Sequence, residues 1–235
     1  MNTNHNEIYP YVCVYTGLME DNVELYTIAD HLSYNSGDNL LFDWRPWSVF
    51  GTYGDANPDV VKDPSNLNSA NKNPNTNYFK EIKIFNRIQE IVKTALDNYI
   101  AKYSINLPEK NFIQESVNIA KYSKNFDYDQ KSEDQSIMIQ GSKAMNFHTD
   151  YSRDQDRKDN FLITCNLYFN DDYKDGGIIF NIEGDIFTYK PKAGEVVVFP
   201  SGSPLFPAGK KYLHAVETPY GKNKFISRNF MMYEN

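Results

Sequence analysis

Three residues of the sequence have the types and the spacing that a metal site requires. The chain has four histidines; a polar terminal segment accounts for His5, and capping and solvation near the end of an expected helix account for His31. The others are His148, which stands two positions before Asp150, and His214. Residues i and i+2 project to the same side of an extended strand, so His148 and Asp150 can share one metal. His214 lies 66 positions later (214 minus 148), so the fold must bring it alongside.

Two histidines and one carboxylate occupy one face of an octahedral metal and leave three positions open. This is the arrangement of non-haem Fe(II) oxygenases, in which the open positions take a chelating cosubstrate and dioxygen. A His-x-Asp triplet is also frequent by chance, and a strand histidine such as His214 is often only hydrogen-bonded. The triplet therefore indicates a metal centre only if the surrounding segments fit the same chemistry.

Short strands are the main elements that would position these residues. After Pro108, runs rich in Val, Ile, Phe and Tyr are separated by Gly, Asp and Pro turns, a pattern that predicts strands. The predicted strands cover residues 114–122, 136–140, 161–169, 178–189, 195–199, 212–216 and 223–232. Short strands that follow helices favour an α+β fold with a double-stranded β-helix (jelly-roll or cupin-like) core, buttressed by N-terminal helices.

The N-terminal half predicts helices and loops instead. Apolar residues at helical spacing predict a helix from Asp21 to Leu32 and a long amphipathic helix from Tyr78 to Tyr103. Residues 52–77 are rich in Gly, Pro, Asn and Asp and predict a loop. The polar stretches 123–135 and 151–160 are expected to be mobile loops near His148 and Asp150 that become ordered when substrate binds; a solvated surface without a role is the alternative, and direct contact with substrate is left open.

Composition limits the class of protein. The 235 residues show no compositional boundary, so one domain over residues 1–235 is expected, with 1–110 as helical support and loops and 111–235 as the jelly-roll core. A net charge of -7 argues against a nucleic-acid partner held through many phosphates. Cys13 and Cys165 lie in apolar runs and make no disulfide framework. With neither a signal segment nor an apolar run of membrane-spanning length, a cytoplasmic location is expected.

The C-terminal segment carries a family resemblance. The motif Tyr212-Leu-His-Ala-Val, followed by Gly221-Lys-Asn-Lys-Phe, resembles the distal motif of prolyl 4-hydroxylase-like Fe(II)/2-oxoglutarate-dependent dioxygenases, in which a basic residue follows the second histidine by nine or ten positions. Here the step from His214 to Lys224 is ten (224 minus 214). The resemblance implies that Lys224 pairs with the distal carboxylate of 2-oxoglutarate through a charge-assisted hydrogen bond. Lysine in this role is similar to the collagen-type prolyl hydroxylases.

Three further segments are similar to the same family. Residues 162–170 resemble the strand that follows the first motif in hypoxia-sensing prolyl hydroxylases, where the residue matching Tyr168 donates its hydroxyl to the same carboxylate. Residues 175–177 resemble the family's paired-glycine turn, and residues 191–200 resemble the strand that leads to the second histidine. The resemblance extends over residues 112–235.

Strand alternation adds an expectation for the segment around Tyr168. It places Thr164, Asn166 and Tyr168 on one face and the apolar residues between them on the other. The polar face is therefore expected to line the pocket.

The resemblance implies an Fe(II)- and 2-oxoglutarate-dependent dioxygenase with His148, Asp150 and His214 as iron ligands. It implies Fe(II), 2-oxoglutarate and O2, with ascorbate as an additional candidate, and succinate and CO2 as coproducts. Asp150 favours hydroxylation, because halogenating relatives replace this carboxylate. The implied substrate is a prolyl residue in a peptide or protein, or a free amino acid.

Several alternatives stay open at this stage. Arg228 is an alternative anchor for 2-oxoglutarate, because it shares a strand face with Lys224. A non-redox metal- or sugar-binding jelly roll would need no such anchor, and a dioxygenase of the same class could act on a non-prolyl substrate. Alkylated nucleic acid is disfavoured because it usually requires a basic face.

Some features of the substrate side are also left open. Trp44, Arg45 and Trp47 are candidate substrate contacts, although burial in the core is the commoner fate of tryptophan. The strand that leads to His148 is either 114–122 or 136–140. The oligomeric state is not predicted.

Overall fold

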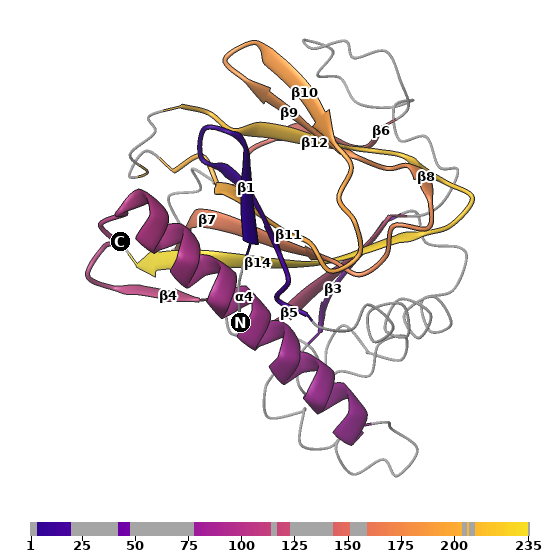
Figure 1. Cartoon of the computed structure of the whole chain (residues 1–235), viewed down its shortest axis with the longest axis horizontal. Helices are drawn as coiled ribbons and strands as arrows, with labels where there is room; N and C mark the ends of the chain where they lie inside the picture. The colour runs from indigo at the N-terminus through magenta and orange to yellow at the C-terminus, as the bar shows by residue number, and fades with distance from the viewer. Residues whose placement is uncertain are drawn as a thin grey trace.

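Two antiparallel β-sheets lie face to face, and a long helix packs on the outer side of the larger sheet (Figure 1). The computed structural model describes residues 4–19, 42–47, 78–113, 117–122, 143–150, 159–203, 206 and 210–234. Several sequence predictions lie outside these residues: the helix at 21–32, the loops at 52–77 and 123–135, most of the loop at 151–160, and the strand at 136–140.

The larger sheet has eight strands in the order β1-β2-β11-β7-β14-β5-β3, with β4 paired to β14. Its strands are β1 (Asn4–Tyr9), β2 (Val12–Thr16), β3 (Phe42–Trp47), β4 (Asn111–Ile113), β5 (Val117–Tyr122), β7 (Asp159–Tyr168), β11 (Val196–Pro200) and β14 (Lys224–Glu234).

The smaller sheet has four strands in the order β10-β9-β12-β6. They are β6 (Lys143–His148), β9 (Ile178–Ile182), β10 (Asp185–Tyr189) and β12 (Leu213–Glu217); a separate pair joins β8 (Lys174–Asp175) to β13 (Pro219–Tyr220). The strands pair antiparallel in the smaller sheet, in the β8–β13 pair and in the larger sheet. Together with one described helix, α4 (Tyr78–Tyr103), they confirm the predicted α+β fold with a jelly-roll-like core.

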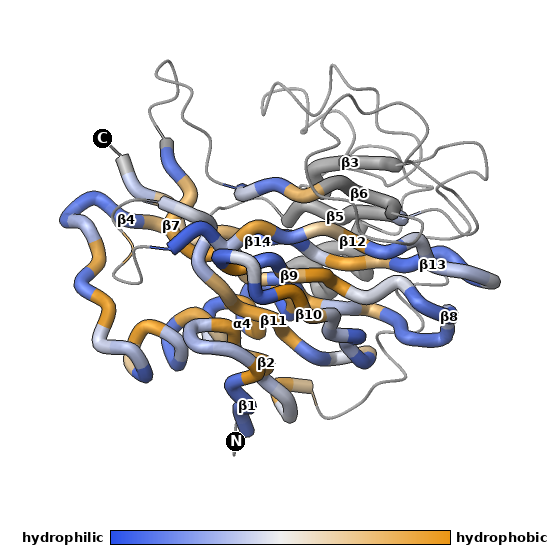
Figure 2. The backbone as a smooth tube through the Cα atoms, turned by 90° about the horizontal axis from the view of Figure 1, so that it is seen from above, coloured by the Kyte–Doolittle hydropathy of each residue, from blue (hydrophilic) through white to orange (hydrophobic). Residues whose placement is uncertain are grey.

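Each face of the larger sheet buries its own apolar cluster. One cluster fills the space between helix α4 and the sheet and includes Val92, Leu96 and Cys165; the other lies on the inner face and includes Tyr168 and Phe199. Apolar colouring follows α4 and the central strands β7, β11 and β9 in Figure 2. The alternation expected for the β7 segment is therefore confirmed, and its polar face is turned toward the smaller sheet.

The elements observed differ from the predicted ones in several places, beginning with β6, which no predicted strand range covers. The run 178–189 is a hairpin of two strands, because Glu183 and Gly184 take left-handed backbone angles (φ 56° and 99°) that turn the chain. Residues 1–110 also contribute strands in addition to helix and loop: β1 and β2 extend the larger sheet through β11, and β3 pairs with β5. The division of the chain into a single domain stays a prediction.

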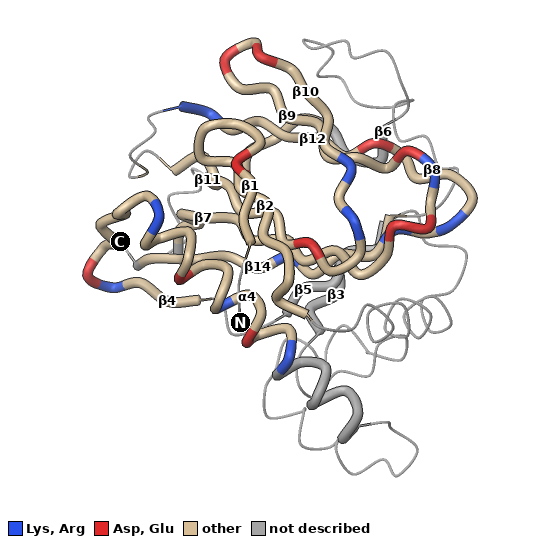
Figure 3. Tube along the Cα trace, in the orientation of Figure 1, with Lys and Arg blue, Asp and Glu red and all other residues tan. Residues whose placement is uncertain are grey.

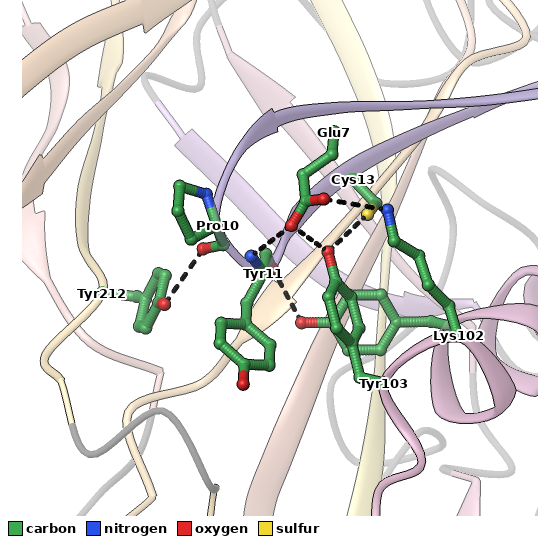
Figure 4. Close-up of polar contacts among 8 residues, drawn as sticks. Glu7, Pro10, Tyr11, Cys13, Lys102, Tyr103 and Tyr212 are labelled. Atoms are coloured by element: carbon green, nitrogen blue, oxygen red, sulfur yellow. Dashed lines mark hydrogen bonds and ion pairs between the residues drawn. The ribbon is translucent and has the colours of Figure 1, made fainter.

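A polar cluster fastens the β1–β2 hairpin to the end of α4 (Figure 4). The Tyr103 hydroxyl donates to Glu7 Oε1 at 2.5 Å and lies 3.1 Å from Cys13 Sγ. Lys102 Nζ donates to Glu7 Oε2 at 3.0 Å. This tyrosine hydrogen bond, opposed by burial and aided by Lys102, keeps the pKa of Glu7 below its ordinary value. The Glu7 carboxylate therefore ties the hairpin to the helix, and the Tyr99 hydroxyl adds a second link by donating to the carbonyl oxygen of Tyr11 at 2.7 Å.

Charged positions lie mostly at turns and strand ends (Figure 3). Acidic residues mark the β9–β10 turn, where Tyr9 donates a hydrogen bond to Asp185. In the described part of the chain, no helix is both long and apolar enough to cross a membrane.

Candidate metal centre

The three predicted metal ligands converge at the inner face of the smaller sheet. One ligand atom from each of His148, Asp150 and His214 lies within 4.8 Å of the others. His214 Nε2 is 3.4 Å from Asp150 Oδ2, and His148 Nε2 is 3.7 Å from Asp150 Oδ1. Two imidazoles and a carboxylate at this separation are a donor set that fits Fe(II).

Strand register explains why residues 66 positions apart meet. His148 ends β6 and pairs directly with His214 of β12, so their ring centroids are only 4.3 Å apart. Asp150 follows β6 by two residues and reaches the same point. The side chain of His148 is 26% exposed, whereas those of Asp150 and His214 are 3% and 6% exposed. The cluster is therefore open on the His148 side and closed behind His214.

Aromatic packing and burial keep His214 in the form that a metal requires. Phe199 lies edge-on to its ring at 4.8 Å, and Nδ1 is 3.3 Å from the carbonyl oxygen of Tyr212. Burial, reinforced by the nearby His148, lowers the pKa of His214 to about 4, against the opposing pull of Asp150. A neutral imidazole whose ring is fixed by a hydrogen bond at the other nitrogen is a competent ligand.

The pKa of Asp150 is lowered in spite of its burial. Burial would raise its pKa, but His214, Arg228 and His148 together with a hydrogen bond from Thr164 hold the pKa below its ordinary value. Thr164 Oγ1 donates to Asp150 Oδ2 at 2.8 Å and lies 2.8 Å from the hydroxyl of Ser201. The lowered pKa favours the carboxylate form, which is the form that binds a cation.

Lys224 lies on the inner face of the larger sheet, at the start of β14. Its side chain is fully buried, and its ammonium lies 5.2 Å, 5.1 Å and 6.0 Å from the ring centroids of Tyr122, Tyr168 and Tyr173. Nζ donates to the carbonyl oxygen of Gly176 at 2.6 Å. Burial, with a smaller contribution from Lys190, lowers its pKa to about 7, while Glu217 opposes the shift. In its ammonium form this buried amine can pair with an anion.

The paired-glycine turn accounts for the close approach of backbone to Lys224. Gly176 has φ +70°, and a Cβ there would lie 2.7 Å from the Tyr173 ring. Gly177 donates its N–H to Glu217 Oε2 at 2.9 Å. The turn therefore requires glycine, and it points the Gly176 carbonyl oxygen at the Lys224 ammonium.

The remaining predicted residues fall into three groups. Arg228 lies on the same strand as Lys224 but contacts the metal cluster, with Nη1 3.6 Å from Asp150 Oδ1. The side chains of Trp44, Arg45 and Trp47 lie outside the described residues, and only their backbone in β3 is described. The strand that leads to His148 is β6, which is neither of the two predicted alternatives: 114–122 contains β5 of the other sheet, and 136–140 lies outside the described residues.

Sequence reasoning missed the residues that surround the predicted ones. Tyr122 and Tyr173 line the Lys224 pocket, and Ser201 supports Thr164. Strand alternation placed Thr164 on the polar face, but it did not predict the hydrogen bond between Thr164 and Asp150. Tyr122 ends a predicted strand, which was the one available signal.

Comparison with known proteins agrees with this geometry. Residues 135–232 match the sequence profile of the 2OG-Fe(II) oxygenase superfamily. The match contains His148, Asp150, His214 and Lys224. This superfamily implies Fe(II), 2-oxoglutarate and O2. No curated protein matches the sequence.

Solved structures share the fold at low sequence identity. A viral collagen prolyl hydroxylase from Paramecium Bursaria Chlorella virus-1 has a TM-score of 0.56 and 14% identity, covering 100% of this chain and 99% of that one. A Pseudomonas putida prolyl-4-hydroxylase has a TM-score of 0.51 and 12% identity over 96% and 94% of the two chains. A Trichoplax adhaerens prolyl hydroxylase, in complex with a peptide fragment of the hypoxia inducible factor oxygen degradation domain, has a TM-score of 0.50 and 11% identity over 95% and 84%.

Proposed function

We propose that this chain is an Fe(II)- and 2-oxoglutarate-dependent dioxygenase that hydroxylates a prolyl residue in a peptide or protein, or a free amino acid. The family match at residues 135–232 supports the enzyme class. One observation carries the proposal: a buried amine, Lys224, lies on the sheet face that looks toward the His148, Asp150 and His214 cluster. A metal site alone would not require this amine. The prolyl preference is supported by the structural neighbours, and fold similarity is a weak guide to substrate.

His148, Asp150 and His214 would hold Fe(II). When bound, Fe(II) with 2-oxoglutarate and O2 supplies the oxidation of an unactivated C–H bond, with succinate and CO2 as coproducts. The chain itself provides the ligand geometry. His214 is fixed by Phe199 and by the Tyr212 carbonyl, and Asp150 is fixed by Thr164.

Lys224 and Tyr168 would bind the distal carboxylate of 2-oxoglutarate. Both side chains are buried, and the amine lies 5.1 Å from the tyrosine ring. A carboxylate that replaces the Gly176 carbonyl as partner of the ammonium gains a charge-assisted hydrogen bond. The phenol of Tyr168 can donate a second one. This end of the pocket would orient the cosubstrate and exclude water from it.

The proposal is tested by anaerobic loading of the protein with Fe(II) and 2-oxoglutarate, followed by oxygen and a panel of proline-containing peptides and free amino acids. Succinate formation and a mass gain of one oxygen in a substrate are expected. His214→Ala, which lacks a proposed ligand, is the matched control and should form neither product. Failure to form succinate under any condition would contradict the dioxygenase activity; succinate without a hydroxylated prolyl or amino-acid product would contradict only the substrate class.

A further inference from the structure

The two oxygens of Asp150 have different neighbours. Oδ2 accepts a hydrogen bond from Thr164 at 2.8 Å and lies 3.4 Å from His214 Nε2. Oδ1 lies 3.6 Å from Nη1 of Arg228 and 3.7 Å from His148 Nε2. The side chain is only 3% exposed, so these neighbours decide what each oxygen can bind.

Arg228 is held in place by the strand that carries it. It belongs to β14 and pairs with Asn166 of β7, and its guanidinium lies 5.2 Å from the ring centroid of Phe230. That ring is itself stacked on Phe161 at 4.2 Å. The side chain is 19% exposed. A planar cation packed on an aromatic face keeps a defined position beside the carboxylate.

The position of this cation matters because a carboxylate can bind a metal through one oxygen or through two. Three protein ligands leave three octahedral positions. The 2-oxo acid requires two of them and O2 requires the third. If Asp150 bound through both oxygens, one of those positions would be lost. A positive charge at Oδ1 repels a metal cation from that oxygen and leaves Oδ2, on the His214 side, as the ligand atom.

We propose that Arg228 is a positioning residue that keeps Oδ1 of Asp150 away from the metal, so that Asp150 binds the metal through Oδ2 alone and three positions stay open. The inference rests on the metal site of the proposed function. It gives Arg228 a role distinct from that of Lys224, since it acts on the metal end of the pocket through Asp150. Thr164 orients the same carboxylate from the opposite side through a hydrogen bond to Oδ2.

The change in metal affinity on removal of Arg228 distinguishes this role from that of an ordinary structural ion pair, because the two predict opposite signs. If Arg228 only stabilised the ligand geometry, its removal would weaken metal binding. If Arg228 repels the metal from Oδ1, its removal takes away a like charge and frees a second ligand oxygen. Metal affinity then rises, while the open positions that 2-oxoglutarate needs become fewer.

The test uses the full chain loaded with Mn(II), a redox-stable ion that accepts the same nitrogen and oxygen ligands. Arg228→Met removes the charge at similar length, Arg228→Lys keeps it, and Lys224→Met removes a cation from the same strand away from Asp150. Calorimetry gives the Mn(II) affinity of each protein and the 2-oxoglutarate affinity of each loaded protein. Water-proton relaxation gives the number of metal-bound waters.

For Arg228→Met we expect Mn(II) affinity to rise roughly tenfold, one metal-bound water fewer than in the parent chain, and a loss of 2-oxoglutarate affinity smaller than that of Lys224→Met. Arg228→Lys should retain the parent water count. Weaker or unchanged Mn(II) binding by a folded Arg228→Met with an unchanged water count would overturn the inference. If Arg228→Met does not fold, the parent decides: three bound waters support the inference and two overturn it. A parent chain that binds no Mn(II) would instead overturn the metal site of the proposed function.

Discussion

His148 and His214 lie directly opposite each other on the antiparallel strands β6 and β12, with ring centroids 4.3 Å apart. The pairing is part of the backbone ladder of the smaller sheet, so the distance between the two imidazoles depends on strand register and not on a mobile loop. A site built on paired strands holds its ligands more firmly than one built on loops. Asp150, just past the end of β6, is the ligand whose position depends on side-chain contacts.

Removing any ligand should therefore abolish tight metal binding. His148→Ala, Asp150→Ala and His214→Ala each leave two ligands, which hold Fe(II) poorly. We expect succinate formation to be lost. Calorimetry should show Mn(II) affinity weakened by at least about tenfold. His5→Gln changes an exposed strand histidine and should leave both quantities unchanged. Full activity of Asp150→Ala without added carboxylate would refute hydroxylation by this centre.

Replacement of Lys224 should separate cosubstrate binding from metal binding. Lys224→Ala removes the ammonium from the tyrosine-lined pocket, and the loss of a charge-assisted bond to a buried carboxylate costs about 2–3 kcal/mol, or roughly 30- to 150-fold in affinity. The 2-oxoglutarate affinity of the Mn(II)-loaded protein should fall by that factor while Mn(II) affinity is retained. Arg228→Ala should reduce 2-oxoglutarate affinity less. The reverse order would assign the anchor to Arg228.

The pH dependence of cosubstrate binding should report the state of Lys224. Burial lowers its pKa to about 7, and only the ammonium form pairs with a carboxylate. Affinity for 2-oxoglutarate is therefore highest below pH 7 and falls by up to about tenfold per pH unit above it. The charged or titratable groups that surround the amine are Tyr122, Tyr168, Tyr173, Lys190 and Glu217.

Arginine at the same position supplies the control for this pH profile, because it stays protonated throughout the range. Calorimetry between pH 7 and pH 9 should show a sloping profile for the parent chain and a flatter one for Lys224→Arg. Equal slopes would mean that a different group titrates. In the parent chain without ligands, Lys224 binds its proton more tightly in the unfolded state than in the fold, because the fold lowers its pKa from 10.5 to about 7. The free energy of unfolding should therefore increase as pH rises from about 7 toward 10.5.

The polar cluster at Glu7 should contribute to stability without affecting the metal site. Tyr103→Phe removes the hydroxyl that donates to Glu7 and contacts Cys13, and should lower the free energy of unfolding by about 1 kcal/mol in urea titrations. The pKa of Glu7 is lowered in the fold, chiefly by this hydrogen bond. Its contribution is therefore present above pH 4.5 and is lost as pH falls below that value.

A surface ion pair on the same helix offers the comparison for Tyr103. Lys93 and Asp97 pair at 2.5 Å with side chains 65% and 57% exposed. Lys93→Ala should change the free energy of unfolding by less than about 0.5 kcal/mol. A loss for Tyr103→Phe no greater than that would show that the Tyr103 hydroxyl does not help to hold the hairpin to the helix.

Local patterns in the sequence predicted what is determined locally. The period of the apolar residues predicted α4 from Tyr78 to Tyr103, and alternation predicted that Thr164 and Tyr168 share a face. The metal cluster was predictable because His-x-Asp and a single distant histidine left few other combinations. The resemblance of the C-terminal segment to the family's distal motif also indicated Lys224 as a cosubstrate residue, a role that stays a proposal.

Tertiary contacts were beyond these patterns. Val14 of β2 pairs with Val197 of β11 across more than half of the chain, and a short apolar run carries no information about which strand it will join. The contact of Arg228 with Asp150 arises in the same way, because alternation predicts a shared face but not the residue that lies across from it. The enclosure of Lys224 by Tyr122 and Tyr173 likewise depends on the start of β14, the end of β5 and the bend before β8 lying together.

Gly176 should be less replaceable than Gly221, and the comparison of the two glycines isolates the reason. Gly176 and Gly221 both have left-handed angles (φ +70° and +83°), so alanine at either costs about 1–2 kcal/mol of backbone strain. At Gly221 the added Cβ meets nothing within 4 Å, whereas at Gly176 it lies 2.7 Å from the Tyr173 ring. Gly176→Ala must therefore displace that ring or the turn whose carbonyl accepts the Lys224 hydrogen bond.

We expect Gly176→Ala to lose more free energy of unfolding than Gly221→Ala in urea titrations, and to lose 2-oxoglutarate affinity that Gly221→Ala retains. Equal effects of the two substitutions on 2-oxoglutarate affinity would show that the turn does not shape the Lys224 pocket.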